Sequence, residues 1–408
     1  MQPLIDLIRR EIAARGVLPF ARFMELALYC PDYGYYQTKK DNPGRRGDFF
    51  TSVSVGELFG QLLAFQFAGW LDELKSLNPQ PSTLNLIEAG AHDGTLANDI
   101  LNWLQLSRPK LFEQIQYGII EPSLRRQAWQ REKLEKFAPR VEWFADFENL
   151  KLKTRNFKLT GIIFSNELLD AMPVHRLGWD AAAKKWFEWG VALAGEKIVW
   201  ARCADFLAPQ SGERGFNPSS GLHLLARRSE AETAPSALLD VLPDGYTVEV
   251  SSAAENWWRE AAGILERGRL LTIDYGFDAG ELFSASRPRG TLRAYFRHHV
   301  ADDILANAGE QDITAHVNFS AIQAVGESAG LTTESFSTQA QFLTRILERA
   351  VKDKSFGELV SPKSEGGGGR DGWNLSRTRQ FQTLTHPEHL GRAFRILVQF
   401  KKPPATRS

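Results

Sequence analysis

The segment from Leu86 to Leu96 carries the clearest chemical pattern of the chain: a short apolar run ends in glycines and turns straight into a helix. Gly90 and Gly94 flank His92 in this turn. Such a turn brings bare backbone and the positive end of a helix to the carboxyl edge of a sheet, where α/β proteins bind nucleotide-like cofactors. A dinucleotide fingerprint needs a third glycine that this turn lacks, which disfavours NAD. Two glycines after a strand also occur in plain turns.

Two carboxylates follow the next apolar runs. Glu121 ends the run Tyr117–Ile120, where an acidic side chain can accept hydrogen bonds from the ribose diol of an adenosine-containing cofactor. Asp146 follows the run Val141–Phe144 and is placed to meet an adenine amino group. Either carboxylate alone could be a solvated surface group, but their succession after neighbouring strands indicates a cofactor site.

A pair of carboxylates, Glu167 and Asp170, follows the apolar run Gly161–Ser165. If this segment makes a helical turn, the three-residue spacing directs both side chains into one pocket. There they would hold a cationic or nitrogen substrate and help to align it with an electrophile. The structural alternative is that Glu167 caps the turn and Asp170 binds backbone amides.

Composition excludes several classes of function. The 49 Lys and Arg residues balance 49 Asp and Glu residues, so no net positive charge points to nucleic acid or to an anionic membrane. Cys30 and Cys203 are far apart, and the histidine spacings match no zinc signature, so neither a disulfide framework nor a metal site is expected. No apolar stretch is long enough to span a bilayer. The first residues lack the features of a signal or transit peptide, so a cytoplasmic location is expected.

The elements that must position these residues alternate along the chain. Residues 1–80 are predicted to form a helical region, and from residue 81 strands and helices alternate as in a parallel sheet covered on both faces. Arg269–Asp274 continues this sheet, and Phe394–Phe400 is predicted to be its last, edge strand. Residues 175–200 change to a pattern typical of an inserted antiparallel ribbon. The predicted fold class is therefore α/β.

Short segments in a specific order carry a resemblance to a known family: Phe23–Tyr29 with Gly34–Tyr36, Gly47–Ser52 with Leu58–Gly60, Glu88–Gly90 with Gly94–Leu96, Asn166–His175, Asp274–Gly276 and Asp312–Phe319. Through them, most of the chain resembles the MidA-like family of class I S-adenosyl-L-methionine (SAM) dependent methyltransferases. The mitochondrial member of that family is an arginine methyltransferase that assists assembly of respiratory complex I. The resemblance implies a Rossmann-like, seven-stranded SAM-binding sheet in residues 81–408, with insertions at about 175–265 and 278–325, and an N-terminal region, 1–80, that closes over the cofactor.

The resemblance also implies roles for individual residues. Glu167 and, less directly, Asp170 would be the catalytic residues that orient the methyl acceptor. The implied cofactor-binding residues are Gly47, Asp48, Thr51, Ser52, Glu88, Gly90, Gly94, Thr95, Glu121, Asp146 and Asn166. Two departures accompany this set. Family members commonly have Pro-Glu where this chain has Val53-Ser54, and a glycine where it has His92, whose Cβ would narrow the space for the cofactor.

The expected function is methyl transfer from SAM to an arginine, or to another nitrogen, of a partner protein. Two alternatives stay open. A methyltransferase fold with weak or no turnover could serve as an assembly or binding factor, which would form a stable complex without methylating it. A small-molecule N-methyltransferase would use the same acidic pocket for an amine metabolite.

Overall fold

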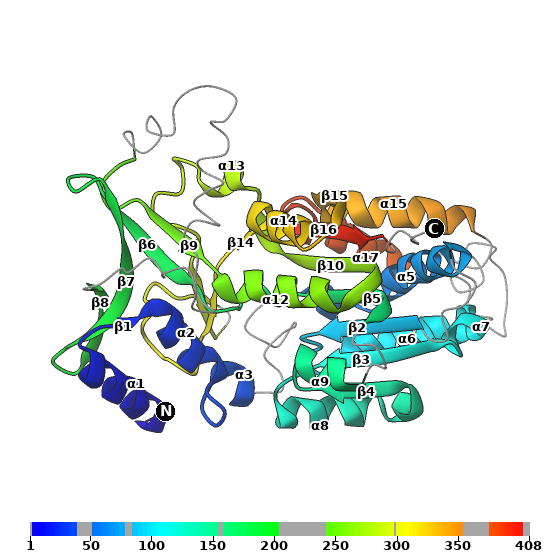
Figure 1. Ribbon diagram of the computed structural model, residues 1–408, viewed down its shortest axis with the longest axis horizontal. Coiled ribbons are helices and arrows are strands. Elements are labelled where there is room, and N and C mark those ends of the chain that lie inside the picture. The colour runs from blue at the N-terminus through cyan, green and yellow to red at the C-terminus, as the bar shows by residue number, and fades with distance from the viewer. Residues whose placement is uncertain are drawn as a thin grey trace, which may run out of the picture.

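The computed structural model describes residues 2–38, 51–77, 84–153, 158–203, 242–297, 299–353 and 375–402. Its centre is a mixed sheet, at the right in Figure 1, in which neighbouring strands follow the order β15-β16-β10-β5-β2-β3-β4, with β14 paired to the end of β10. The strands are β2 (Leu84–Ala89), β3 (Ile115–Ile120), β4 (Val141–Phe144), β5 (Leu159–Asn166), β10 (Leu265–Phe277), β14 (Val317–Asn318), β15 (Thr332–Thr338) and β16 (Phe394–Lys401).

The strand directions confirm the predicted parallel sheet, with one correction at its edge. Strands β4, β3, β2, β5 and β10 run parallel, so their carboxyl ends share one edge. Strand β16 was predicted to be the last edge strand, and this was wrong. It lies inside the sheet, antiparallel to both β10 and β15. The edge strand is β15, which the sequence did not reveal because its residues are mostly small and polar.

Helices cover both faces of the central sheet, as predicted. One face packs against α5 (Leu58–Leu77), α6 (Thr95–Ser107) and α15 (Gln339–Lys352), and the other against α9 (Phe147–Lys153), α12 (Ser252–Ile264) and α14 (Phe319–Ser328). The remaining helices of this part are α4 (Ser52–Val55), α7 (Pro109–Phe112), α8 (Leu124–Lys133), η1 (Glu135–Arg140), α13 (Ala279–Leu282), α17 (Leu375–Thr385) and α18 (Leu390–Ala393).

A second body of antiparallel strands stands at the left in Figure 1 and confirms the predicted inserted ribbon. One of its sheets contains β1 (Leu18–Pro19), β6 (His175–Asp180), β7 (Lys185–Ala194), β8 (Lys197–Arg202) and β9 (Thr247–Val250). The other contains β11 (Arg293–Phe296), β12 (His299–Val300) and β13 (Asp312–Thr314). Helices α1 (Gln2–Arg15), α2 (Phe20–Tyr29) and α3 (Tyr35–Thr38) lie with these strands in Figure 1.

The helices within residues 1–80 pack against two different parts of the molecule. Leu4 and Phe23 of α1 and α2 share a buried cluster with Val191 and Ile313 of the antiparallel strands. Helix α5 instead belongs to the cluster on the central sheet. Since the apolar clusters do not by themselves set a boundary at residue 80, the division into 1–80 and 81–408 stays a prediction.

Candidate active site

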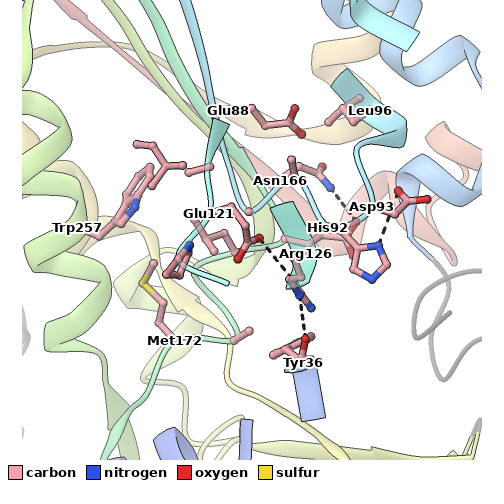
Figure 2. Close-up of a pocket in the computed structure, with 18 of the residues that line it drawn as sticks. Tyr36, Glu88, His92, Asp93, Leu96, Glu121, Arg126, Asn166, Met172 and Trp257 are labelled. Atoms are coloured by element: carbon pink, nitrogen blue, oxygen red, sulfur yellow. Dashed lines mark hydrogen bonds and ion pairs between the residues drawn. The ribbon is translucent and has the colours of Figure 1, made fainter. Parts of the chain in front are cut away.

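A cavity of about 460 Å³ lies at the shared carboxyl edge of the central sheet, a size typical of sites for small molecules. Segments that follow β2, β3, β4 and β5 line it, together with residues of α3, α4 and α12 (Figure 2). Eight of the sequence-predicted site residues are in its lining: Thr51, Glu88, Gly90, Thr95, Glu121, Asp146, Asn166 and Glu167. The fold thus brings together residues that are up to 116 positions apart in the chain, Thr51 and Glu167.

The glycine turn after β2 forms one wall. Gly90 has φ +74°, a left-handed conformation that favours glycine, and a Cβ there would approach Leu168 Cδ1 to 2.9 Å. Gly94 does not line the cavity; it starts α6 in the left-handed conformation, with φ +85°. Asp93 accepts hydrogen bonds from the Thr95 backbone N–H (3.0 Å) and from Thr95 Oγ1 (2.9 Å), which fixes the start of the helix.

His92 keeps the backbone shape that a glycine would take, with φ +47°. Its ring lines the cavity, with Nδ1 3.8 Å from Asp93 Oδ1, and burial lowers its pKa so that the ring is neutral at neutral pH. Among the described residues nothing hydrogen-bonds to its buried Nε2. The imidazole therefore narrows the cavity but adds one polar atom that a ligand could satisfy.

Glu88 lies at the end of β2 and is almost fully buried, at 2% exposure. The hydroxyl of Tyr117 donates a hydrogen bond to Glu88 Oε2 at 2.5 Å. Burial raises the pKa of Glu88 to about 8, so this carboxyl is mostly protonated at neutral pH when the cavity holds no cation.

The raised pKa of Glu88 predicts how stability depends on pH. Because the folded-state pKa exceeds the ordinary value of 4.5, the contribution of protonated Glu88 is complete below pH 4.5 and is lost as the pH rises through about 8. Between pH 6 and pH 8 the free energy of unfolding should therefore fall by roughly 2 kcal/mol less in Glu88→Gln than in the unmodified protein. Urea unfolding at both pH values measures this difference. An equal decrease in the free energy of unfolding in both proteins would contradict it.

Glu121 directly follows β3 and lines the cavity, and it is only 4% exposed. It accepts hydrogen bonds from the Ser123 backbone N–H (2.9 Å) and from Gln130 Nε2 (3.4 Å), and Arg126 Nη1 lies 4.0 Å from its Oε2. Burial raises its pKa, and the Arg126 charge opposes this shift. The Arg126 guanidinium also lies 5.0 Å from the ring centroid of Tyr36, and Figure 2 shows it between Tyr36 and Glu121.

Asp146 lines the cavity after β4, and its Oδ1 accepts hydrogen bonds from the backbone N–H and the Nδ2 of Asn149, each at 2.8 Å. It therefore also starts α9, and its assignment to an adenine amino group stays a prediction. Phe147 follows it, with its ring centroid 5.4 Å from that of Trp257. Trp257 and Met172 lie at the opposite side of the pocket from His92 in Figure 2, so one end is aromatic and apolar and the other is polar.

Glu167 lines the cavity at the end of β5 and has φ +53°, a left-handed conformation that is unfavourable for a residue with a Cβ. Its Oε1 accepts a hydrogen bond from Asn166 Nδ2 at 3.0 Å, and the backbone N–H of Ser52 also donates to its carboxyl. Burial raises its pKa to about 8. The segment does not form the helical turn that would direct both carboxylates into one pocket. Asp170 is accordingly buried outside the cavity lining, hydrogen-bonded to Asp274.

The remaining predicted residues belong to the front segment. Thr51 lines the cavity and caps α4, with its Oγ1 accepting from the Ser54 backbone N–H at 3.1 Å. Ser52 is buried behind it and donates from Oγ to Gln339 Oε1 at 3.0 Å. Gly47 and Asp48 lie outside the described residues. The roles assigned to all these residues stay predictions.

The cavity lining also includes residues whose sequence context predicts no site role, among them Tyr29, Tyr36, Arg126, Trp257 and Glu260. Only Arg126 left a usable signal, since it is a basic residue in the first turn of the helix that follows Glu121. The others come from segments whose place beside the sheet edge depends on tertiary packing.

Comparison with known proteins identifies the family. The family model described as "Putative S-adenosyl-L-methionine-dependent methyltransferase" matches residues 62–337, which is more than half of the chain. The chain belongs to this family. A structure from Burkholderia thailandensis with bound S-adenosyl-homocysteine is 30% identical, with a TM-score of 0.74, and the match covers 98% of this chain and 92% of that one. A second structure from the same organism is 29% identical, with a TM-score of 0.72.

Curated relatives agree with this family. "Protein arginine methyltransferase NDUFAF7 homolog, mitochondrial" of Drosophila melanogaster is 25% identical over 417 residues, covering 96% of this chain and 84% of the relative. "Protein arginine methyltransferase NDUFAF7, mitochondrial" of Homo sapiens is 26% identical over 348 residues, covering 80% of this chain and 69% of the relative. The MidA-like resemblance is confirmed: the protein is a class I methyltransferase, and its cofactor is SAM.

The predicted location of the protein was also wrong. The expectation of a cytoplasmic location is contradicted by the curated relatives, which are named as mitochondrial proteins. No helix in the described parts of the chain combines the length and the apolar character needed to cross a membrane.

The residues of the cavity fit SAM. Gly90 keeps the left-handed turn after β2 at the cavity wall, and Arg126 Nη2 and His92 Nε2 are buried polar atoms without a partner among the described residues. The apolar end beside Trp257 suits a flat base, and the polar end beside His92 suits a charged amino acid moiety.

Proposed function

We propose that this protein transfers the methyl group of SAM to a guanidinium nitrogen of an arginine in a partner protein. The observation that carries the proposal is Glu167, a carboxyl that lines the cofactor cavity on a left-handed backbone. A carboxylate can bind a guanidinium through two parallel hydrogen bonds, which orients the nitrogen as well as attracting it. The curated relatives named as protein arginine methyltransferases support the same acceptor.

The cofactor would be held by residues at the ends of four strands, β2, β3, β4 and β5. In this proposal Glu121 accepts hydrogen bonds from the ribose, Asp146 meets the adenine, and Gly90, Glu88, Thr95 and Asn166 contact the methionine part. When bound, SAM supplies an electrophilic methyl group on a positively charged sulfonium. Loss of this methyl group turns the sulfonium into a neutral thioether. Alignment with a nucleophile is therefore the main task left to the protein.

Glu167 would provide that alignment and accept a proton. The acceptor nitrogen forms a bond to the methyl carbon while the carbon–sulfur bond breaks and its electron pair stays on sulfur. The nitrogen then carries one proton too many, and this proton passes to the Glu167 carboxylate. A pKa raised to about 8 suits a carboxyl that must take up a proton near neutral pH.

We further propose that the helical region 1–80 closes the cofactor site of the methyltransferase domain 81–408. Two contacts support this. Arg126 Nε donates a hydrogen bond to the backbone oxygen of Tyr36 at 2.9 Å, and the backbone N–H of Ser52 donates to Glu167. The N-terminal region thus contacts both the proposed ribose side and the proposed acceptor side.

Isotope transfer tests the proposed function. The protein should transfer label from methyl-tritiated SAM to a protein in an extract, and acid hydrolysis of that protein should release labelled methylarginine. Label found only in a protein-free metabolite fraction would refute the protein acceptor. Binding of SAM without any label transfer would refute turnover and favour a binding factor.

A further inference from the structure

The left-handed backbone at Glu167 needs a cause. A residue with a Cβ occupies this conformation only where its surroundings impose it, and such residues gather at functional sites. The β5 strand pairs with β10 up to Asn166, which lies opposite Ile273. Directly after that pair, the Glu167 backbone N–H donates to the Ile273 carbonyl oxygen at 2.9 Å, and the chain leaves the sheet.

The next two backbone N–H groups meet one carboxylate. Leu168 N and Leu169 N donate to Asp274 Oδ2 at 3.1 and 2.8 Å, and Tyr275 N donates to Asp274 Oδ1 at 2.8 Å. Successive backbone N–H groups that converge on one anion form a concave nest, and here the anion belongs to the protein itself. Asp274 is completely buried, so water does not compete for these hydrogen bonds.

Asp170 completes the arrangement through its contact with Asp274. It is buried and hydrogen-bonded to Asp274, and burial together with the neighbouring Asp274, Asp312 and Glu167 carboxyls raises its pKa well above the ordinary value. Two carboxyls in contact cannot both be ionised, so Asp170 is the protonated partner and donates to Asp274. Burial raises the pKa of Asp274 to about 7, so of the two carboxyls Asp274 is the one that ionises first, and as a carboxylate it accepts hydrogen bonds from several directions and donates none.

We propose that Asp274 is a positioning residue for methyl transfer: its carboxylate binds the backbone N–H groups of Leu168 and Leu169 and so holds Glu167 in the left-handed conformation that places its carboxyl at the cavity. The inference rests on the acceptor role of Glu167 in the proposed function. Asp274 does not line the cavity, so it acts through the loop and not by contact with a substrate.

Asp274→Asn tests this role with almost no change in the size of the side chain. The asparagine amide has the same shape but offers one acceptor oxygen and one NH₂ donor. The carboxylate receives backbone N–H groups at both of its oxygens, so the NH₂ must face at least one donor and lose that bond. Glu249→Gln serves as the control, because Glu249 is also a buried carboxyl that accepts a backbone N–H, from Thr291 at 2.7 Å, and does not line the cavity.

Hydrogen–deuterium exchange followed by mass spectrometry tests the loop directly. Peptides that cover residues 167–170 should exchange at least about tenfold faster in Asp274→Asn and at the original rate in Glu249→Gln. In parallel, kcat should fall by about tenfold or more in Asp274→Asn, because a small misplacement of an orienting group is costly. The dissociation constant for S-adenosyl-homocysteine, measured by calorimetry, should stay within about threefold.

Other results would overturn the inference. Unchanged exchange at Leu168 and Leu169 in Asp274→Asn would show that the carboxylate does not hold the loop. Equal losses of kcat in Asp274→Asn and Glu249→Gln would show a general structural effect. If Asp274→Asn does not fold, fast exchange of these two amides in the unmodified protein would refute the inference, and protected amides would support it. If exchange is faster in Asp274→Asn but the unmodified protein transfers no methyl group, the proposed function is refuted and the role of Asp274 in holding the loop is not.

Discussion

Replacing Glu167 by glutamine should lower the rate of methyl transfer by about 10²–10⁴-fold and leave S-adenosyl-homocysteine binding within about threefold. Glutamine preserves the size of the side chain and can still accept the Asn166 hydrogen bond through its oxygen. It carries no negative charge for a guanidinium, however, and cannot accept the proton that the nitrogen loses. Steady-state methylation with labelled SAM and calorimetric titration measure the two quantities.

The pH dependence adds a second readout for Glu167. Its pKa of about 8 predicts a transfer rate that rises with pH up to about 8, because the carboxylate form is the one that binds the acceptor and takes the proton. The residual activity of Glu167→Gln should not show this rise with pH. Glu266→Gln provides a control, since Glu266 is an exposed carboxylate on β10 that does not line the cavity. A Glu167→Gln variant with the original rate would contradict the role assigned to Glu167.

The positions of the cofactor-side residues could be predicted because they depend on local rules. Gly90, Glu121 and Asp146 each follow a short apolar run, and the carboxyl ends of parallel strands share one edge. The sheet neighbours of the last strand could not be predicted in this way. The order of strands in a sheet does not follow chain order, so β16 at the end of the sequence lies between β10 and β15.

The local geometry of the acceptor side depends on tertiary contacts, which residue spacing does not reveal. The three-residue spacing of Glu167 and Asp170 is that of a helical turn, but the amides that would start the helix bind Asp274, which lies 105 and 106 positions away from them. Left-handed residues other than glycine are uncommon, so spacing rules do not anticipate Glu167. Tyr36 is likewise brought to Arg126 by contacts between segments 90 positions apart.

Glu121→Ala should weaken SAM binding by about 2–3 kcal/mol, or roughly 30- to 150-fold in the dissociation constant. Hydrogen bonds to an ionised group are worth about 1.5–3 kcal/mol. Alanine removes the proposed bonds to the ribose and also leaves the charge of Arg126, which is largely buried, without its 4.0 Å partner. Titration calorimetry with SAM and with S-adenosyl-homocysteine should show the same loss, because the two ligands share the ribose.

A matched pair of controls separates the ribose contact from a general loss of stability. Glu113→Ala removes an exposed carboxylate just before β3 and should leave binding unchanged, as Glu113 does not line the cavity. Glu121→Gln should bind SAM more weakly than the unmodified protein and without its pH dependence. Burial raises the pKa of Glu121, so in the unmodified protein the affinity should decrease as falling pH protonates the carboxylate. Equal affinities in Glu121→Ala and the unmodified protein would place the ribose elsewhere in the cavity, and Arg126 would then be the first side chain to test.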